Sequence, residues 1–138
     1  MAVFTRTLTF DSRGRNDMID ITAAVQQVLA SGSIDEGIVT VFVPGSTASI
    51  TTIEYEPGLL KDFPRAMDRI APPDEGYDHD AKWGDGNGMS HVRASTVGPG
   101  IVVPFKNKVL LLGTWQQIVL ADFDTRPRKR NVIVQVLG

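Results

Sequence analysis

Side chains that could bind a metal or move a proton are concentrated between Tyr77 and Ser95, in the stretch YDHDAKWGDGNGMSHVRAS. Both histidines of the chain, His79 and His91, lie inside it. A neutral imidazole is a common ligand of transition metals, and it is also the side chain that titrates nearest neutral pH. Polar side chains that could complete a metal site or orient the imidazoles lie beside them: Asp78, Asp80, Asp85 and Asn87.

The local sequence predicts a loop followed by a short helix. Prolines and glycines fill the first part, whereas SHVRAST contains neither and predicts a short helix that ends before Gly98. If the helix begins near Asp85 or Asn87, then Asn87 and His91 lie four residues apart on one face. That face would present an amide and an imidazole together.

The histidine spacing matches no sharp zinc motif. The two histidines are twelve residues apart, HExxH is absent and the chain has no Cys. Loops rich in Asp, Gly and Asn also occur where the side chains only satisfy their own backbone, and a single helical His is more often a surface or packed residue than a ligand. Residue types alone therefore leave a functional site and an ordinary loop as alternatives.

Composition predicts one domain that spans residues 1–138. A chain of 138 residues that is 42% hydrophobic can build one core but not two ordinary ones. A net charge of −2 gives no electrostatic reason to bind nucleic acid or an anionic membrane. The absence of Cys fits an intracellular protein, and MAVFTRTLTF has no sustained apolar run, so we expect no signal peptide, no spanning helix and a cytoplasmic location.

Hydrophobic periodicity in the first half of the chain predicts strands and two main helices. Strand patterns cover Val3 to Phe10, Met18 to Ile21, Gly37 to Val43, and Thr47 to Tyr55. Only three residues separate the last two strands, which could therefore form a hairpin. Helical patterns cover Thr22 to Ser31, with Thr22 as N-cap and Gly32 as stop, and Leu59 to Ile70, with Pro64 inside.

The second half of the chain predicts four more strands: Ile101 to Phe105, Val109 to Trp115, Gln117 to Phe123, and Asn131 to Leu137. This order favours an α+β fold with a largely antiparallel sheet or sandwich, two main helices and the short site helix, over a parallel doubly wound fold. The helices can cover one sheet face. The other face, if apolar, requires a partner, which an oligomer would supply.

Two segments could hold an anion. The basic run of the turn TRPRKR could bind phosphate through charge-assisted hydrogen bonds, although such runs are more often solvated turns or subunit contacts. The segment Gly45-Ser46-Thr47 could offer backbone donors and hydroxyls, but it lacks the GxxxxGK[ST] pattern of a nucleotide-binding loop. The basic run consists of Arg126, Arg128, Lys129 and Arg130.

Glu54 ends a buried-looking strand beside a loop, where a carboxylate could serve as a metal ligand or a general base. The alternative is a solvent-facing residue on an alternating strand. No Ser lies in a GxSxG elbow, so no nucleophilic triad is predicted.

The segments STASITTIE, EPGLLKD, YDH, GDGNGMSH, LLLGTWQQIVLADFD and VIVQVLG together resemble the YjbQ family, also called secondary thiamine-phosphate synthase proteins, from about Thr22 to Gly138. The resemblance implies a small α/β domain that assembles as a homotrimer, with a polar pocket near the subunit boundary that holds a divalent metal or an anion. The family motifs fall on Asn87 with His91, on Tyr77 with His79, and on Leu112 to Gln116.

The resemblance also assigns site residues. Many members have His-Thr-Thr-Ala where this chain has Gly45-Ser46-Thr47-Ala48, so the role of that His does not carry over. The implied catalytic residues are His91, Glu54, Asp85 and Asn87, and the implied metal ligands are His79, His91 and Glu54. The implied substrate-binding residues are Arg126, Arg130, Trp115, Gln116, Ser46 and Thr47.

Two classes of function follow from these assignments. As an enzyme, the chain would join a pyrimidine pyrophosphate to a thiazole phosphate with loss of pyrophosphate, using zinc or magnesium and the basic residues to neutralise the leaving group. A metal-dependent hydrolase of a phosphorylated small molecule would use the same residues. The alternative is a non-catalytic trimer that captures a metal or a small anion.

Overall fold

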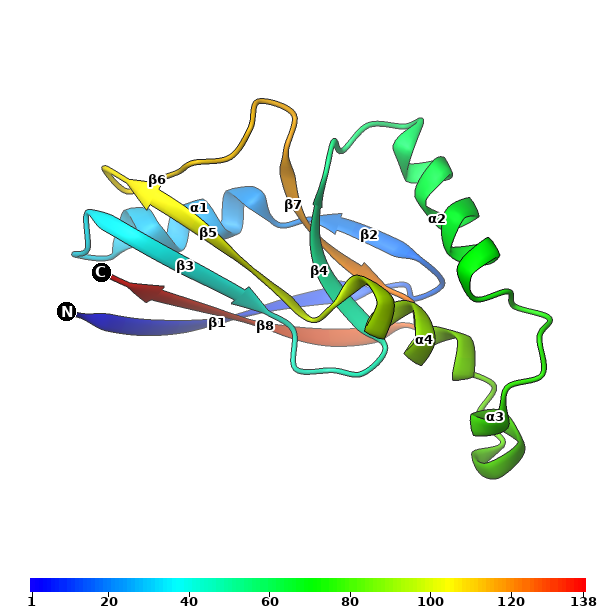
Figure 1. Ribbon diagram of the computed structural model, residues 1–138. Coiled ribbons are helices and arrows are strands. Elements are labelled where there is room, and N and C mark those ends of the chain that lie inside the picture. The colour runs from blue at the N-terminus through cyan, green and yellow to red at the C-terminus, as the bar shows by residue number, and fades with distance from the viewer.

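The computed structural model describes residues 1–138 and contains two antiparallel sheets and four helices (Figure 1). The five-stranded sheet has the order β1 (Val3–Ser12), β8 (Arg128–Leu137), β3 (Glu36–Phe42), β5 (Gly100–Lys106), β6 (Val109–Leu110). The three-stranded sheet has the order β2 (Asp17–Asp20), β7 (Gln117–Asp122), β4 (Ala48–Ile53). The helices are α1 (Thr22–Ser31), α2 (Leu59–Ile70), α3 (Asp78–Trp83) and α4 (Gly88–Val97).

Strand β7 is the centre of the fold because both of its faces are buried. Ile118 and Leu120 pack into the main core, which the five-stranded sheet and α1 share. Val119 and Ala121 point the other way, into a smaller core with Met67 of α2 and with α4. The three-stranded sheet is therefore a middle layer. Its buried strand carries the chain directly to the polar residues that follow it.

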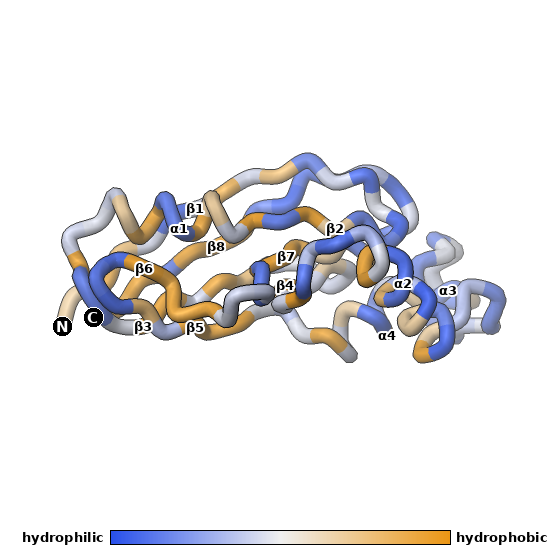
Figure 2. The backbone as a smooth tube through the Cα atoms, turned by 90° about the horizontal axis from the view of Figure 1, so that it is seen from above, coloured by the Kyte–Doolittle hydropathy of each residue, from blue (hydrophilic) through white to orange (hydrophobic).

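The two faces of the five-stranded sheet differ. Valines of β3, β5 and β8 fill the inner face, and Figure 2 shows hydrophobic residues gathered along these strands, with hydrophilic ones around α2 and α3. No helix covers the outer face, where Val3 and Val102 are each 57% exposed and Ile38 and Phe42 each 39%. This is the apolar face that we predicted would require a partner.

The α+β class, the antiparallel pairing and both main helices are confirmed. The hairpin prediction is wrong, because β3 pairs with β5 and β8 whereas β4 pairs with β7 in the other sheet. After β3, the backbone N–H of Val43 donates to the carbonyl of Pro99, and Pro44 has no N–H to donate back to β3. The chain therefore crosses between layers here instead of turning back.

Three local predictions are also corrected. Ile21 is the N-cap of α1, because the Thr22 hydroxyl donates to Asp20 at 2.7 Å and accepts from the Ile118 N–H at 2.8 Å. The segment predicted as a strand to Trp115 stays extended only over Val109–Leu110. Residues 78–83 form the short helix α3 where a loop was expected, and a left-handed Gly84 (φ 71°) ends it.

No helix combines the length and the apolar character that crossing a membrane would require.

Candidate functional site

Helices α3 and α4 bring the two histidines together. The ring centroids of His79 on α3 and His91 on α4 lie 4.5 Å apart. The helices are joined closely, because the Gly88 N–H donates to Asp80 Oδ1 at 2.8 Å and Tyr77 packs over Gly88. A Cβ at position 88 would lie 2.5 Å from the Cβ of Tyr77, so only glycine fits where α4 begins.

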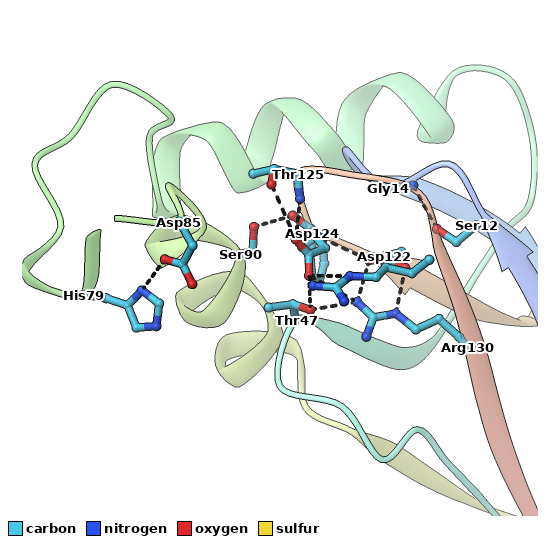
Figure 3. Close-up of polar contacts among 12 residues, drawn as sticks. Ser12, Gly14, Thr47, His79, Asp85, Ser90, Asp122, Asp124, Thr125 and Arg130 are labelled. Atoms are coloured by element: carbon cyan, nitrogen blue, oxygen red, sulfur yellow. Dashed lines mark hydrogen bonds and ion pairs between the residues drawn. The ribbon is translucent and has the colours of Figure 1, made fainter. Parts of the chain in front are cut away.

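His79 faces two carboxylates without bonding to either. Its Nδ1 lies 3.4 Å from Asp85 Oδ1 (Figure 3) and 3.5 Å from Asp80 Oδ1. These distances suit an ion pair, yet neither contact is aligned as a hydrogen bond, so Nδ1 is a buried nitrogen without a partner. The potential ligand atoms of His79, Asp80 and Asp85, one from each residue, all lie within 4.8 Å of one another. A metal ion or a proton would satisfy all three groups.

Asn87 holds Asp85 in place. In the amide orientation that satisfies both groups, the Asn87 side-chain nitrogen donates to Asp85 Oδ1 at 3.1 Å and to Oδ2 at 3.2 Å. Asn87 is buried and caps α4, so the carboxylate is positioned from a rigid element. Asn87 and His91 are one helical turn apart, with the His91 N–H donating to the Asn87 carbonyl at 3.3 Å, but their side chains border different cavities.

A polar cavity of about 220 Å³ opens beside Asp85, and no hydrophobic residue lines it. Asp85 therefore borders both this cavity, which we call the arginine pocket, and the His79 cluster. Arg126 is exposed there and makes no hydrogen bond to the protein, whereas Arg128 donates to Asp124 at 2.8 Å. The other residues that line the arginine pocket are Asn87, Asp124 and Thr125.

A buried ionic network, drawn in Figure 3, borders the arginine pocket through Asp124. Arg130 donates from Nε and Nη2 to Asp122 at 2.7 and 2.9 Å, and from Nη2 to the Thr47 hydroxyl at 2.7 Å. Thr47 in turn donates to Asp124 at 2.9 Å. Asp122 and Asp124 are almost fully buried, with exposed fractions of 0% and 1%, and both accept hydrogen bonds from within the protein.

The network changes the pKa of its members. The hydrogen bond to Asp122 raises the pKa of Arg130 above its usual value, against the opposing effect of burial. Burial by itself would raise the pKa of Asp124. Hydrogen bonds from Thr47, from the Thr125 backbone and from Arg128 outweigh that effect and hold the pKa below its usual value. Both groups are therefore charged at neutral pH and paired.

The basic run is only partly a turn. Arg126 lies in the turn, but Arg128, Lys129 and Arg130 belong to β8, so the prediction that all four occupy a turn is wrong. The strand continues because Arg130 and Phe10 are ladder partners on adjacent strands. Of the two arginines predicted to bind substrate, Arg126 is free to do so, whereas two of the three guanidinium nitrogens of Arg130 are occupied by protein acceptors.

Glu54 lies at the opposite end of the middle sheet from the histidines. The ladder pairs Ala48 with Asp122 at one end of β4 and Ile53 with Gln117 at the other, and Glu54 follows Ile53. Five residues of extended strand cover about 16 Å. Glu54 is exposed at that distant end, so it is not a neighbour of the His79 cluster within one chain.

Trp115 and Gln116 share the end of the sheet where Glu54 lies. Gln116 donates to the Thr52 hydroxyl at 3.1 Å, and Trp115 is 69% exposed. One chain therefore forms two separate groups from the predicted site residues. Asp85, Asn87, His79 and His91 meet at α3 and α4, while Glu54, Trp115 and Gln116 meet beyond the other end of β7.

The predicted metal set of His79, His91 and Glu54 is consequently not formed within one chain. Asp80 and Asp85 take the place of Glu54 beside His79. The roles of Asp122, Asp124 and Arg128 were missed altogether. A signal for the two aspartates exists in the sequence, because LADFD places charged residues at the end of a strand that is otherwise apolar.

Comparison of the sequence with those of known proteins finds a matching family. The model of the family described as "UPF0047 protein YjbQ-like" matches residues 6–138. A UPF0047 protein of Archaeoglobus fulgidus is 38% identical over 130 residues, covering 94% of this chain and 98% of that protein. The UPF0047 protein YugU of Bacillus subtilis is 35% identical over 134 residues, covering 96% and 98%.

A solved structure agrees with the fold. The crystal structure of a YbjQ-like protein of unknown function from Sulfolobus solfataricus P2 superposes with a TM-score of 0.94 at 30% identity. The superposition covers 99% of this chain and 98% of that one. The arrangement of sheets and helices is therefore common to the relatives and not particular to this sequence.

Proposed function

The chain belongs to the YjbQ-like UPF0047 protein family, and from this premise we propose that it binds a divalent metal together with a phosphorylated small molecule. The metal ligands are His79, Asp80 and Asp85, and the phosphate is held by Arg126 and Arg128 in the arginine pocket. One observation carries the proposal: Asp85 borders both the three-ligand cluster and the arginine pocket.

The ligand atoms fit a borderline or hard cation. One imidazole nitrogen with two carboxylates suits zinc or manganese, and magnesium would add waters to the carboxylates. Because Nδ1 of His79 is buried without a hydrogen bond, a cation there would remove an unfavourable contact as well as gain ligands. When bound, such a cation supplies positive charge to a phosphate oxygen.

The arginine pocket fits a phosphate group. Arg126 has no partner in the protein, so its five N–H donors are free. Asp124 is already neutralised by Thr47 and Arg128, which limits its repulsion of an anion. The Asn87 amide reaches the same cavity and orients Asp85 at its edge.

The reaction that the family resemblance implies is transfer with loss of pyrophosphate, yielding thiamine phosphate. Such a transfer requires the leaving group to be neutralised, which Arg126 and Arg128 would do beside the metal ligands. His91, with its ring 4.5 Å from that of His79, is the proton carrier in this proposal.

A non-catalytic metal- or anion-binding role is the second candidate. It is favoured by the position of Glu54, since one chain places no further carboxylate from that strand end near His91. An enzyme should lose turnover in His91→Ala while keeping its metal. A binding protein should show no turnover in the wild type when it is supplied with a pyrimidine pyrophosphate and a thiazole phosphate.

We also propose that the chain assembles as a homotrimer through the outer face of the five-stranded sheet. The uncovered side chains there include Val3, Ile38, Phe42 and Val102, and a second copy would remove them from water. Assembly would also allow the Glu54 and Trp115 end of one chain to meet the histidines of another. Val102→Asp should give monomers in light scattering, whereas a Val102→Asp protein that remains trimeric contradicts this interface.

The metal site is tested by elemental analysis of protein purified without chelator and then supplied with zinc or manganese. We expect about one ion per chain in the wild type and in Asp78→Ala, which alters an exposed carboxylate of α3 outside the cluster. Asp85→Ala should lose the ion while keeping its fold by circular dichroism. Metal-free wild type, or full occupancy in Asp85→Ala, contradicts the proposal.

The phosphate site is tested by calorimetric titration with pyrophosphate in the presence of the metal. Arg126→Ala should weaken binding by about tenfold or more, because it removes a charge-assisted contact. Arg69→Ala is the matched control, since Arg69 is an exposed arginine on α2 that makes no hydrogen bond within the protein. Equal affinities in the two variants contradict the assignment of Arg126.

A further inference from the structure

A second hollow borders α4 beyond its first turn, whereas the arginine pocket borders the Asn87 cap. It has a volume of about 220 Å³ and is lined by Gly45, Ser46 and Ala48 of the crossing between layers, and by His91 and Ser95 of α4. His91 thus faces this hollow while its ring also contacts His79. No carboxylate lines the hollow.

The polar groups around this hollow have no partners in the protein. The hydroxyls of Ser46 and Ser95 make no hydrogen bond within the chain, in contrast to the nearby buried serines. Ser49 donates to the Ala94 carbonyl and Ser90 to the Phe123 carbonyl. Donors and an imidazole therefore surround a space that the protein leaves open.

Arg130 adds a free donor next to Gly45. Its Nε and Nη2 are held by Asp122 and Thr47, but Nη1 has no acceptor in the protein. A Cβ built on Gly45 would lie 3.0 Å from that Nη1. Any side chain at position 45 would therefore cover the free nitrogen, and glycine leaves it uncovered. The backbone of Gly45 does not need glycine for its φ, so the open space is the feature that requires it.

The two hollows are physically connected through the buried network. Asp124 lines the arginine pocket and accepts from Thr47, and Thr47 accepts from Arg130, whose Nη1 lies under Gly45. Arg128 and Arg130 are held in place by the buried carboxylates. A ligand that reaches from one hollow to the other would meet donors at both ends.

We propose that the Gly45 hollow is a second phosphate subsite, with Arg130 Nη1, Ser46 and Ser95 as donors, and that Gly45 keeps it open. This inference rests on the proposed function, because the second phosphate belongs to the same ligand as the first. The ligand class is then a small molecule that carries two phosphate groups, or two phosphorylated molecules bound side by side. His91 lines the Gly45 hollow and its ring contacts that of His79, so it lies beside the second phosphate.

The test is a titration of the ¹⁵N-labelled protein with inorganic phosphate, followed by amide chemical shifts. Two groups of amides should move: those of residues 45, 46 and 95, and those of residues 125 and 126. Gly45→Val should weaken the response of the first group by about tenfold or more, because it covers Nη1, and leave the second unchanged. Arg126→Ala should do the reverse.

Matched variants separate a local effect from a general one. Gly76→Val makes the same substitution at a glycine whose added Cβ would meet no atom within 4 Å, and both responses should persist. Ser95→Ala should weaken the first response without altering Arg130, which guards against misfolding of Gly45→Val. If only residues 125 and 126 respond in the wild type, the second subsite is overturned and the proposed function stands.

The opposite results are equally clear. If residues 45, 46 and 95 respond and residues 125 and 126 do not, the arginine pocket is wrong and the Gly45 hollow is the phosphate site. If neither group moves at millimolar phosphate, both assignments are overturned.

Discussion

Two polar regions lie side by side in this protein and differ in how completely their groups are paired. The network of Asp122, Asp124 and Arg130 at the end of β7 is buried, and its carboxylates accept hydrogen bonds from Thr47, Arg128 and Arg130 at 2.7 to 3.1 Å. The cluster of His79 on α3 and Asp85 between α3 and α4 is partly exposed, and its central nitrogen has no hydrogen bond. Both contain charged residues that suit catalysis.

The difference indicates which region is scaffold and which is site. The buried carboxylates Asp122 and Asp124 accept hydrogen bonds from the protein and have no capacity left for a ligand, and removal of Arg130 would leave Asp122 unpaired, although Nη1 of Arg130 stays free beside Gly45. A cluster with an unpartnered nitrogen retains the capacity to bind a metal at a cost to stability. The network should therefore determine the stability of the fold, whereas the cluster should determine metal binding.

The largest effect should come from Arg130→Met. This change leaves the buried Asp122 carboxylate without its bidentate partner, and we expect a loss of about 3–5 kcal/mol in the free energy of unfolding. Lys129→Met is the control, because Lys129 forms only an exposed pair with Asp11 at 3.6 Å and should change stability by less than about 0.5 kcal/mol. Urea denaturation measures both. Equal losses of unfolding free energy in the two variants would contradict the role of the network in stabilising the fold.

Thr47→Val should cost less. The hydroxyl of Thr47 accepts from Arg130 and donates to Asp124, and valine has nearly the same shape without it. We expect a loss of about 1–3 kcal/mol in urea denaturation. Ser46→Ala, which removes an adjacent exposed hydroxyl, should have little effect on stability. A stable Thr47→Val protein would show that the network is not held through this residue.

Acid should weaken the network selectively. The folded protein holds the pKa of Asp124 below its usual value, so the unfolded state binds the proton more readily. The stability that this carboxylate contributes is therefore fully present above its unfolded pKa of about 3.9 and is lost as the pH falls through the lower folded pKa. The difference in unfolding free energy between wild type and Asp124→Asn should shrink as the pH falls below about 4. A constant difference contradicts this assignment.

The smallest effect on stability should come from His79→Ala without metal. Because its Nδ1 makes no hydrogen bond, we expect a change below about 1 kcal/mol. With zinc at a hundred times its dissociation constant, the wild type should gain about 2.7 kcal/mol and His79→Ala should gain almost none. If His79→Ala lowers the free energy of unfolding as much as Arg130→Met does, the His79 cluster stabilises the fold and its assignment as a binding site is contradicted.

The sequence predicted where the helices and strands lie better than it predicted which strands pair. The run from Gln117 to Phe123 indicated a strand, and β7 is that strand, with both of its faces buried. Alternation shows which face of a strand is buried but not which strand lies beside it. The segments around Pro44 were therefore predicted as a hairpin, although the chain crosses there from one sheet to the other.

The site was predictable where it is local in sequence. Asn87 and His91 share one turn of α4, and His79 lies one short helix away, so spacing alone brought them near. Glu54 illustrates the limit, because its distance from His79 depends on which end of β4 approaches α4. That depends on the register of β4 with β7, which no local pattern reveals.

The most direct test of the account is a crystal structure of the protein grown with zinc, measured on both sides of the zinc absorption edge. We expect one anomalous peak per chain, about 2.0–2.1 Å from Nδ1 of His79 and at ligand distance from Asp80 and Asp85. The peak should be absent from crystals of Asp85→Ala. A peak only at another position, or none at His79 in the wild type, would contradict the assignment of this cluster as the metal site.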